Sequence, residues 1–153
     1  MTAYTGEMSE VLTSNDVKTL LHAKIDGMDY PSGLDPFAKV YNWNGSSADA
    51  LYDNMPQMQS PSVVTWYEGS DWGDVPRRKQ KWRLFVVVSC VAKKKASWES
   101  ADNEAAMYVE DLVDVLTRII LDADARCDVV NDKAVVVDPA IAAYEIQVHV
   151  RDH

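Results

Sequence analysis

Apolar residues recur at helical spacing in two parts of this chain. Thr13 and Asp16 stand at capping-box spacing, and an apolar stripe follows them at positions 17, 20, 21 and 25. A longer stripe occupies residues 101–122, with acidic residues in its first turn, where they suit the helix dipole. These two patterns predict amphipathic helices, each of which buries one face.

Alternation of apolar and polar residues predicts strands between and after these helices. The strands are expected at residues 37–43, 62–67, 79–91, 135–137 and 142–150. In the longest one, the even-numbered residues from Trp82 and the odd-numbered residues from Arg83 lie on opposite faces. Residues 68–76, which contain Gly and Asp, predict a hairpin loop, and residues 48–61 are typical of a long connection with room for one helical turn.

The order helix–strand–strand–strand–helix–strand–strand predicts an α+β fold. We expect a mixed, mostly antiparallel β-sheet packed against two helices, within one domain that spans residues 1–153 and begins with an N-terminal arm, residues 1–12. A chain of this length buries a sufficient core without a disulfide or a metal. Residues 1–12 lack the pattern of a signal peptide, and no apolar run approaches the length of a membrane span, so no membrane contact is expected.

The net charge of the chain limits the classes of partner that it is expected to bind. The chain has 15 Lys and Arg against 24 Asp and Glu, a formal net charge of −9. A free-standing nucleic-acid binder usually carries a basic face, whereas this chain as a whole repels phosphate. Such a protein can still line a passage through which DNA moves without binding.

No group of residues in the sequence has the spacing of a catalytic or metal site. His22, His149 and His153 are scattered, and there is no CxxC pair and no Gly-rich phosphate loop. We therefore expect no catalytic residues, no cofactor and no bound metal. Cys90 and Cys127 are expected to be free thiols, with a disulfide between them as the alternative.

Two basic clusters and two loop tryptophans are the candidate interface. In an acidic protein, basic clusters favour contact with a neighbour's acidic patch, and tryptophan is enriched among interface anchors. The candidate residues are Trp72, Asp74, Arg77, Arg78, Lys79, Lys93, Lys94, Lys95 and Trp98. The acidic residues available as partners are Asp49, Asp53, Asp111, Asp114, Asp122 and Asp124. A solvated surface or a nucleic-acid contact are the alternatives for the basic clusters.

The order and lengths of these elements resemble those of a known family. The residues that carry the resemblance are 14–17 at the start of the first helix, 61–64, 82–88, the helix 105–120 and the last strand 143–148. Over residues 12–150 the chain resembles the tail terminator proteins of long-tailed bacteriophages and related small minor tail proteins. The resemblance implies an α/β sandwich that forms a homohexameric ring, caps the tail tube, stops its polymerisation and provides a docking surface for the head.

The resemblance also implies the partners and the location. These are further copies of the chain, the tail tube protein and the head–tail connector protein, at the head-proximal end of a virion tail that assembles in the host cytoplasm. DNA would pass through the ring without specific binding, and the family has no catalytic residues to carry over. The alternatives are a head–tail connector or another minor tail protein, a small soluble ligand-binding domain or enzyme, and a host-directed regulatory binding module.

Overall fold

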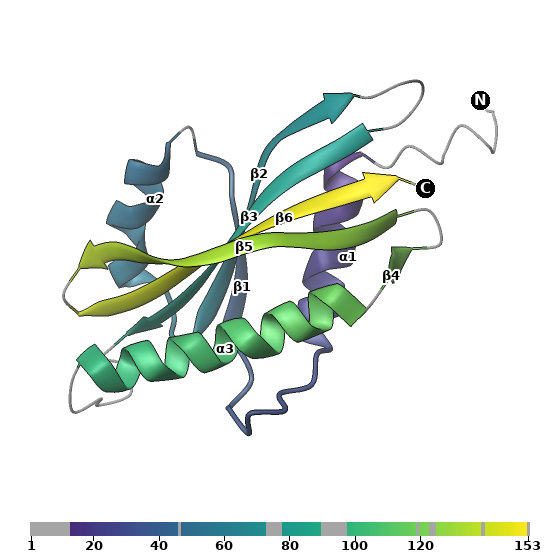
Figure 1. The fold of residues 1–153 in the computed structure, drawn as a ribbon. Helices are drawn as coiled ribbons and strands as arrows, with labels where there is room; N and C mark the ends of the chain where they lie inside the picture. The colour runs from purple at the N-terminus through teal and green to yellow at the C-terminus, as the bar shows by residue number, and fades with distance from the viewer. Residues whose placement is uncertain are drawn as a thin grey trace.

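The fold is that of a computed structural model, which describes residues 13–45, 47–72, 78–89, 98–118, 120–122, 125–138 and 140–152. Figure 1 shows its helices and strands. In chain order they are α1 (Ser14–Asp26), β1 (Lys39–Trp43), α2 (Ala48–Asn54), the short 3-10 helix η2 (Met55–Gln57), β2 (Ser62–Trp72), β3 (Arg78–Ser89), α3 (Trp98–Arg118), β4 (Ile120–Asp122), β5 (Ala125–Asp138) and β6 (Ile141–Asp152).

The strands form one six-stranded sheet in the order β1-β2-β3-β6-β5-β4. β1 pairs with β2 in parallel, and all other neighbours are antiparallel. The parallel pair requires a crossover connection, which α2 and η2 supply. The predicted α+β class, with a mixed and mostly antiparallel sheet, is therefore confirmed.

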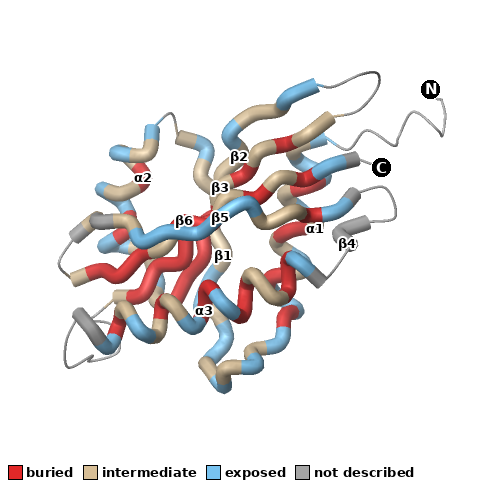
Figure 2. The backbone as a smooth tube through the Cα atoms, in the orientation of Figure 1, coloured by how far each residue is buried: buried red, intermediate tan, exposed pale blue. Residues whose placement is uncertain are grey.

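Helices cover the two faces of the sheet unequally. α1 and α3 lie on one face, and their buried residues join the even-numbered residues of β3 in the main core. α2 packs on the opposite face, where Leu51 and Met55 meet Phe85 and Val87. Figure 2 shows buried backbone concentrated where the strands pass between these layers. The opposite faces predicted for β3 are confirmed, and α2 is a third helix beyond the two expected.

The first helix begins as its capping box predicts. Thr13 Oγ1 accepts a hydrogen bond from the Asp16 amide at 3.1 Å, and the Thr13 amide donates to Asp16 Oδ2 at 3.0 Å. The apolar stripe then places Val17, Leu21 and Ile25 in the core. Reciprocal capping satisfies two amides that the first helical turn leaves without partners.

One predicted strand end was wrong in the first half of the chain. β2 was expected to end at Tyr67, but it continues to Trp72 through a β-bulge between Tyr67 and Gly69. Gly69 has a φ of +139°, a conformation that glycine adopts more readily than other residues. Because a bulge interrupts the apolar–polar alternation, the residues beyond it were mistaken for a loop.

Two further boundaries differ in the second half. The long helix was expected to reach Asp122, but α3 ends at Arg118 and Ile120 pairs with Arg126 of β5. β5 was expected only at residues 135–137, but it begins at Ala125. Asp128, Asn131 and Asp132, residues of low strand propensity, interrupt the apolar residues of this segment. Pairing with β6, which is strongly apolar on its inner face, makes this segment a strand.

The burial of α3 generates a stability prediction. Leu112 is fully buried between α3 and the sheet, so Leu112→Ala leaves a cavity and is expected to lower the free energy of unfolding by about 2–5 kcal/mol. Thr117→Ala, on the exposed side of the same helix, is the control and is expected to change it by less than about 0.5 kcal/mol. Urea denaturation measures both, and equal effects would contradict the packing of α3.

Candidate functional site

One face of the sheet changes from apolar to charged along β3. Phe85 and Val87 pack under α2, and Arg83, Lys81 and Lys79 continue the same face as charged positions. The neighbouring strands β6 and β5 also change from apolar to charged residues on this face. The charged half, called here the polar face, comprises Lys79, Lys81 and Arg83 of β3, Glu145, Gln147, His149 and Arg151 of β6, and Arg126, Asp128 and Asn131 of β5.

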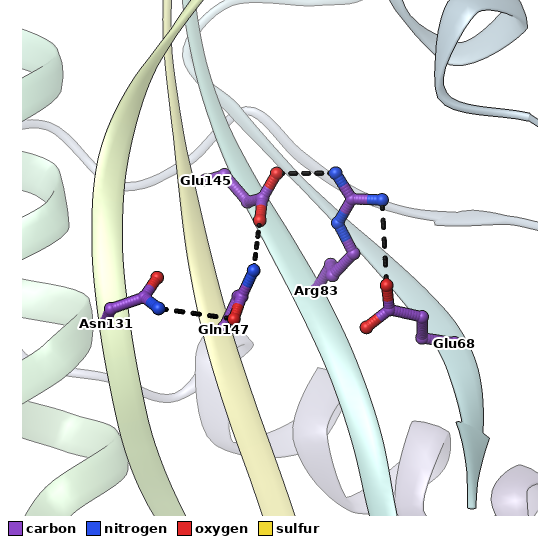
Figure 3. A network of polar contacts seen from close by, with 5 residues as sticks. All are labelled: Glu68, Arg83, Asn131, Glu145 and Gln147. Carbon is purple, nitrogen blue, oxygen red and sulfur yellow. Dashed lines mark hydrogen bonds and ion pairs between the residues drawn. The ribbon is translucent and has the colours of Figure 1, made fainter.

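A buried ion pair lies at the boundary between the two halves. Arg83 Nη2 donates to Glu145 Oε1 at 2.6 Å, and these side chains are only 16% and 1% exposed. Gln147 Nε2 donates to the other Glu145 oxygen at 3.0 Å, and Asn131 in turn donates to Gln147 (Figure 3). The guanidinium of Arg83 also reaches Glu68 at 3.8 Å. The polar face is thus anchored by a continuous network across four strands.

The network fixes the charge of both partners. Burial by itself would raise the pKa of Glu145, but hydrogen bonds from Arg83 and Gln147 and the charge of Arg83 lower it below its usual value. Burial opposes the charge of Arg83 as well, and Glu145 and Glu68 outweigh it, so the pKa of Arg83 is raised. Both groups are charged at neutral pH. The Arg83 guanidinium also lies over the rings of Trp66 and Phe85, at 4.8 and 5.3 Å.

Beyond the network, three cations stand directly opposite one another across adjacent strands. Lys79 is the register partner of Arg151, and Arg151 is that of Arg126. We call these three residues the basic row. Like charges directly opposite are destabilising in a sheet. Such an arrangement inside a chain of net charge −9 concentrates positive charge in one place.

Two carboxylates share the cations at this end of the polar face. Asp71 lies 3.7 Å from Lys79 and 3.8 Å from Lys81. Asp128 lies 2.9 Å from Arg151 and 3.9 Å from Arg126. Among the side chains that the structure describes, four cations therefore meet two carboxylates, which leaves an excess of positive charge that an anionic partner would neutralise.

His149 lies in the middle of these charges. Its register partners are Lys81 on one side and Asp128 on the other. Burial lowers its pKa first, and the charges of Lys79, Arg151 and Lys81 lower it further, against the opposing charge of Asp128. The imidazole is consequently neutral at pH 7, so the excess charge of the polar face comes from Lys and Arg.

The candidate residues of the hairpin end lie on the other face. Arg78 donates to Tyr67 Oη at 2.9 Å and to Ser70 Oγ at 2.8 Å, and its guanidinium stacks over Trp72 at 5.4 Å. Tyr67 and Ser70 are hydrogen-bonded to each other. Trp72 is 62% exposed, as a partner-facing anchor would be. Arg78 is thus bound within its own hairpin, whereas Lys79 belongs to the polar face.

The remaining candidates are not brought into this site by the described structure. Asp74, Arg77, Lys93, Lys94 and Lys95 lie outside the described residues, and so do the side chain of Trp98 and the residues Cys90 and His153. Among the expected acidic partners, Asp111 is only 3% exposed and accepts a hydrogen bond from Ser32 Oγ at 2.8 Å. It holds the connection after α1 against α3, so it is unavailable to a partner.

Sequence reasoning missed most of the polar face. Arg126, Asp128 and Arg151 were not among the candidates, because Arg126 was placed outside any strand. The alternating polar residues Glu145, Gln147 and His149 were the available signal. They mark one side of the last strand as polar, but which cations lie opposite them depends on the pairing of β5 with β6.

His22 and Cys127, two other reactive side chains in the described part of the chain, make contacts that stabilise the fold. His22 Nε2 lies 2.7 Å from Thr65 Oγ1, and Thr65 is fully buried, so this contact ties α1 to the sheet. Cys127 is a free, buried thiol whose pKa burial raises to about 12. The described residues contain no group of His, Cys, Asp or Glu arranged to hold a metal, and none of their helices is long and apolar enough to cross a membrane.

Comparison of the sequence with known protein families and with curated proteins finds no match. The arrangement of charges on the fold therefore carries the functional argument.

The buried ion pair generates a stability prediction. Glu145→Leu leaves Arg83 buried without its carboxylate and is expected to lower the free energy of unfolding by about 3–5 kcal/mol. The double variant Arg83→Met with Glu145→Leu removes both charges and is expected to recover most of that loss. Chemical denaturation at pH 7 measures all three proteins. A double variant as unstable as Glu145→Leu would contradict the pairing.

The same pair predicts a dependence on pH. Because the pKa of Glu145 is lower in the folded chain than its ordinary value of 4.5, its stabilisation is present above that pH and is lost as pH falls through the folded pKa. The difference in unfolding free energy between the unmodified chain and Glu145→Gln is therefore expected to shrink below about pH 4.5. A difference that stays constant from pH 7 to pH 3 would contradict the lowered pKa.

The cations of the basic row are expected to affect the pKa of His149. Lys79→Gln removes one of the cations facing the imidazole and is expected to raise the pKa of His149. NMR titration of the ring protons follows this pKa, and that of His22, which lies on the opposite side of the sheet, serves as the internal control. Added salt is expected to raise the His149 pKa in the unmodified chain and to have less effect in the variant. An unchanged His149 pKa in the Lys79→Gln variant would contradict the effect of the basic row on this imidazole.

Proposed function

We propose that this chain is a structural assembly protein of a bacteriophage tail, a tail terminator whose copies form a ring on the tail tube. The observation that carries the proposal is the open, basic half of the sheet face in a chain that is otherwise acidic. A surface on which cations outnumber their carboxylate partners fits a partner with acidic residues, and other copies of this chain carry such residues in excess. The resemblance of the element order supplies the kind of assembly.

The proposed activity needs geometry and charge but no reaction. A ring of copies bound to the last turn of tube subunits stops further addition, because its outer side lacks the tube's own docking surface. That outer side then serves as the docking surface for the head. The overall acidic charge supports the proposal, since a passage lined mostly by carboxylates lets DNA through without holding it.

The proposal has a direct test. A tail tube protein from the same genome, identified by its self-polymerisation, is allowed to polymerise with and without the purified chain, and tube lengths are measured by electron microscopy. Capping is expected to shorten the tubes and to leave a ring at one end. A head–tail connector or another minor tail protein would instead bind head or tail components without changing tube length. Tubes of unchanged length with no terminal ring would overturn the proposal.

A further inference from the structure

The outward side of α3 is acidic and partly apolar. The helix contains six carboxylates and one basic residue. One stripe of the helix, Asn103, Met107, Glu110, Asp114 and Thr117, is exposed or half-buried, in contrast to the buried stripe beside it. Met107 is 37% exposed, one of three large apolar side chains that are exposed in the described part of the chain. Methionine is enriched at protein interfaces, where its flexible apolar side chain adapts to the surface of a partner.

A shallow groove adjoins this stripe where α3 meets β5. Its apolar lining is Ala106, Val109, Val113 and Tyr144, and its carboxylates are Glu110 and Asp132. Both carboxylate residues are exposed. Long cationic side chains suit such a groove, because their methylene stems lie on apolar surface while their charged ends reach the carboxylates. We call the stripe and the groove together the acidic surface.

The acidic surface and the basic row lie on opposite sides of the same sheet. α3 packs on the face formed by the even-numbered residues of β3, whereas Lys79 and Arg151 project from the other face. The basic row spans two strand spacings, about 10 Å. Glu110 and Asp114 are one helical turn apart, about 6 Å. The two surfaces are therefore opposite in charge and lie on opposite sides of the sheet, an arrangement that lets one copy follow another front to back.

We infer that the basic row of one copy docks on the acidic surface of the next copy. The inference rests on the proposed self-assembly and names its interface. A front-to-back contact is heterologous and builds a ring when the rotation between copies closes. A face-to-face contact would bring one basic row against another and is repelled. The neighbour's α3 would then cover the open half of the sheet, as α2 covers the other half.

Charge reversal on each side separately tests this interface. The basic-row variant is Arg126→Glu with Arg151→Glu, and the acidic-surface variant is Glu110→Lys with Asp132→Lys. Each alone is expected to associate at least 10-fold more weakly than the unmodified chain, because like charges now meet. Sedimentation at several concentrations measures association, and thermal unfolding by circular dichroism shows that each variant is folded. Lys18→Glu with Lys39→Glu is the control for net charge and is expected to associate normally.

Mixing the two variants makes the test specific. In an equimolar mixture, the reversed row of one variant meets the reversed surface of the other, and the two unmodified surfaces also meet. Association is therefore expected to return, with the two variants alternating around the ring. Folded variants that associate normally alone, or that fail to associate when mixed, would overturn the inference. So would an unmodified chain that stays monomeric at every concentration and salt.

Two readouts separate this inference from the proposed function and from nucleic-acid binding. Normal tube capping by the basic-row variant would overturn the interface while the terminator function stands. Association restored by mixing, without any capping of tubes by the unmodified chain, would overturn the function while the interface stands. Binding of a fluorescent DNA duplex that the basic-row variant loses, without self-association of the unmodified chain, would show that the row contacts phosphate and would overturn the inference.

Discussion

The structure depends on the central strand β3, which is buried on both sides over only part of its length. Its even-numbered residues face α1 and α3 throughout, while its other face is apolar at Phe85 and Val87 and charged from Arg83 onward. α2 has seven residues, about 10 Å of helix, and covers the apolar part. The Arg83–Glu145 pair lies at the boundary between the apolar and the charged part of β3. It gives Arg83, the charged residue next to the apolar part, a buried partner.

The burial of the inner face of the sheet also fixes the register that forms the basic row. Directly opposed cations cost free energy, so their register must be imposed by other contacts. The inner positions that alternate with them, including Gln80, Trp82 and Val150, are buried under α1 and α3. Sliding β6 by one residue would expose this core, because every side chain would change face. The burial of the inner face thus imposes a surface arrangement that is unfavourable by itself.

The parts of the fold with an uninterrupted period were predictable. The capping box at Thr13, the apolar stripe of α3 and the alternation around Trp82 each specify an element and its buried side. The predicted boundaries were wrong where a bulge or a run of polar residues interrupts the apolar–polar period. The bulge at Gly69 hides the end of β2, and the polar residues at positions 128, 131 and 132 hide the first half of β5.

The sequence by itself determined the α+β class, the strand and helix that form most of the core, and the acidic character of the chain. Only the tertiary structure decided that Lys79, Arg151 and Arg126 form one row, because these residues come from three strands and meet through pairing. It also decided that Arg78, beside Lys79 in the chain, belongs to the opposite face. Neighbours along a strand point to opposite sides of a sheet, so a basic run in the sequence is divided between two surfaces by folding.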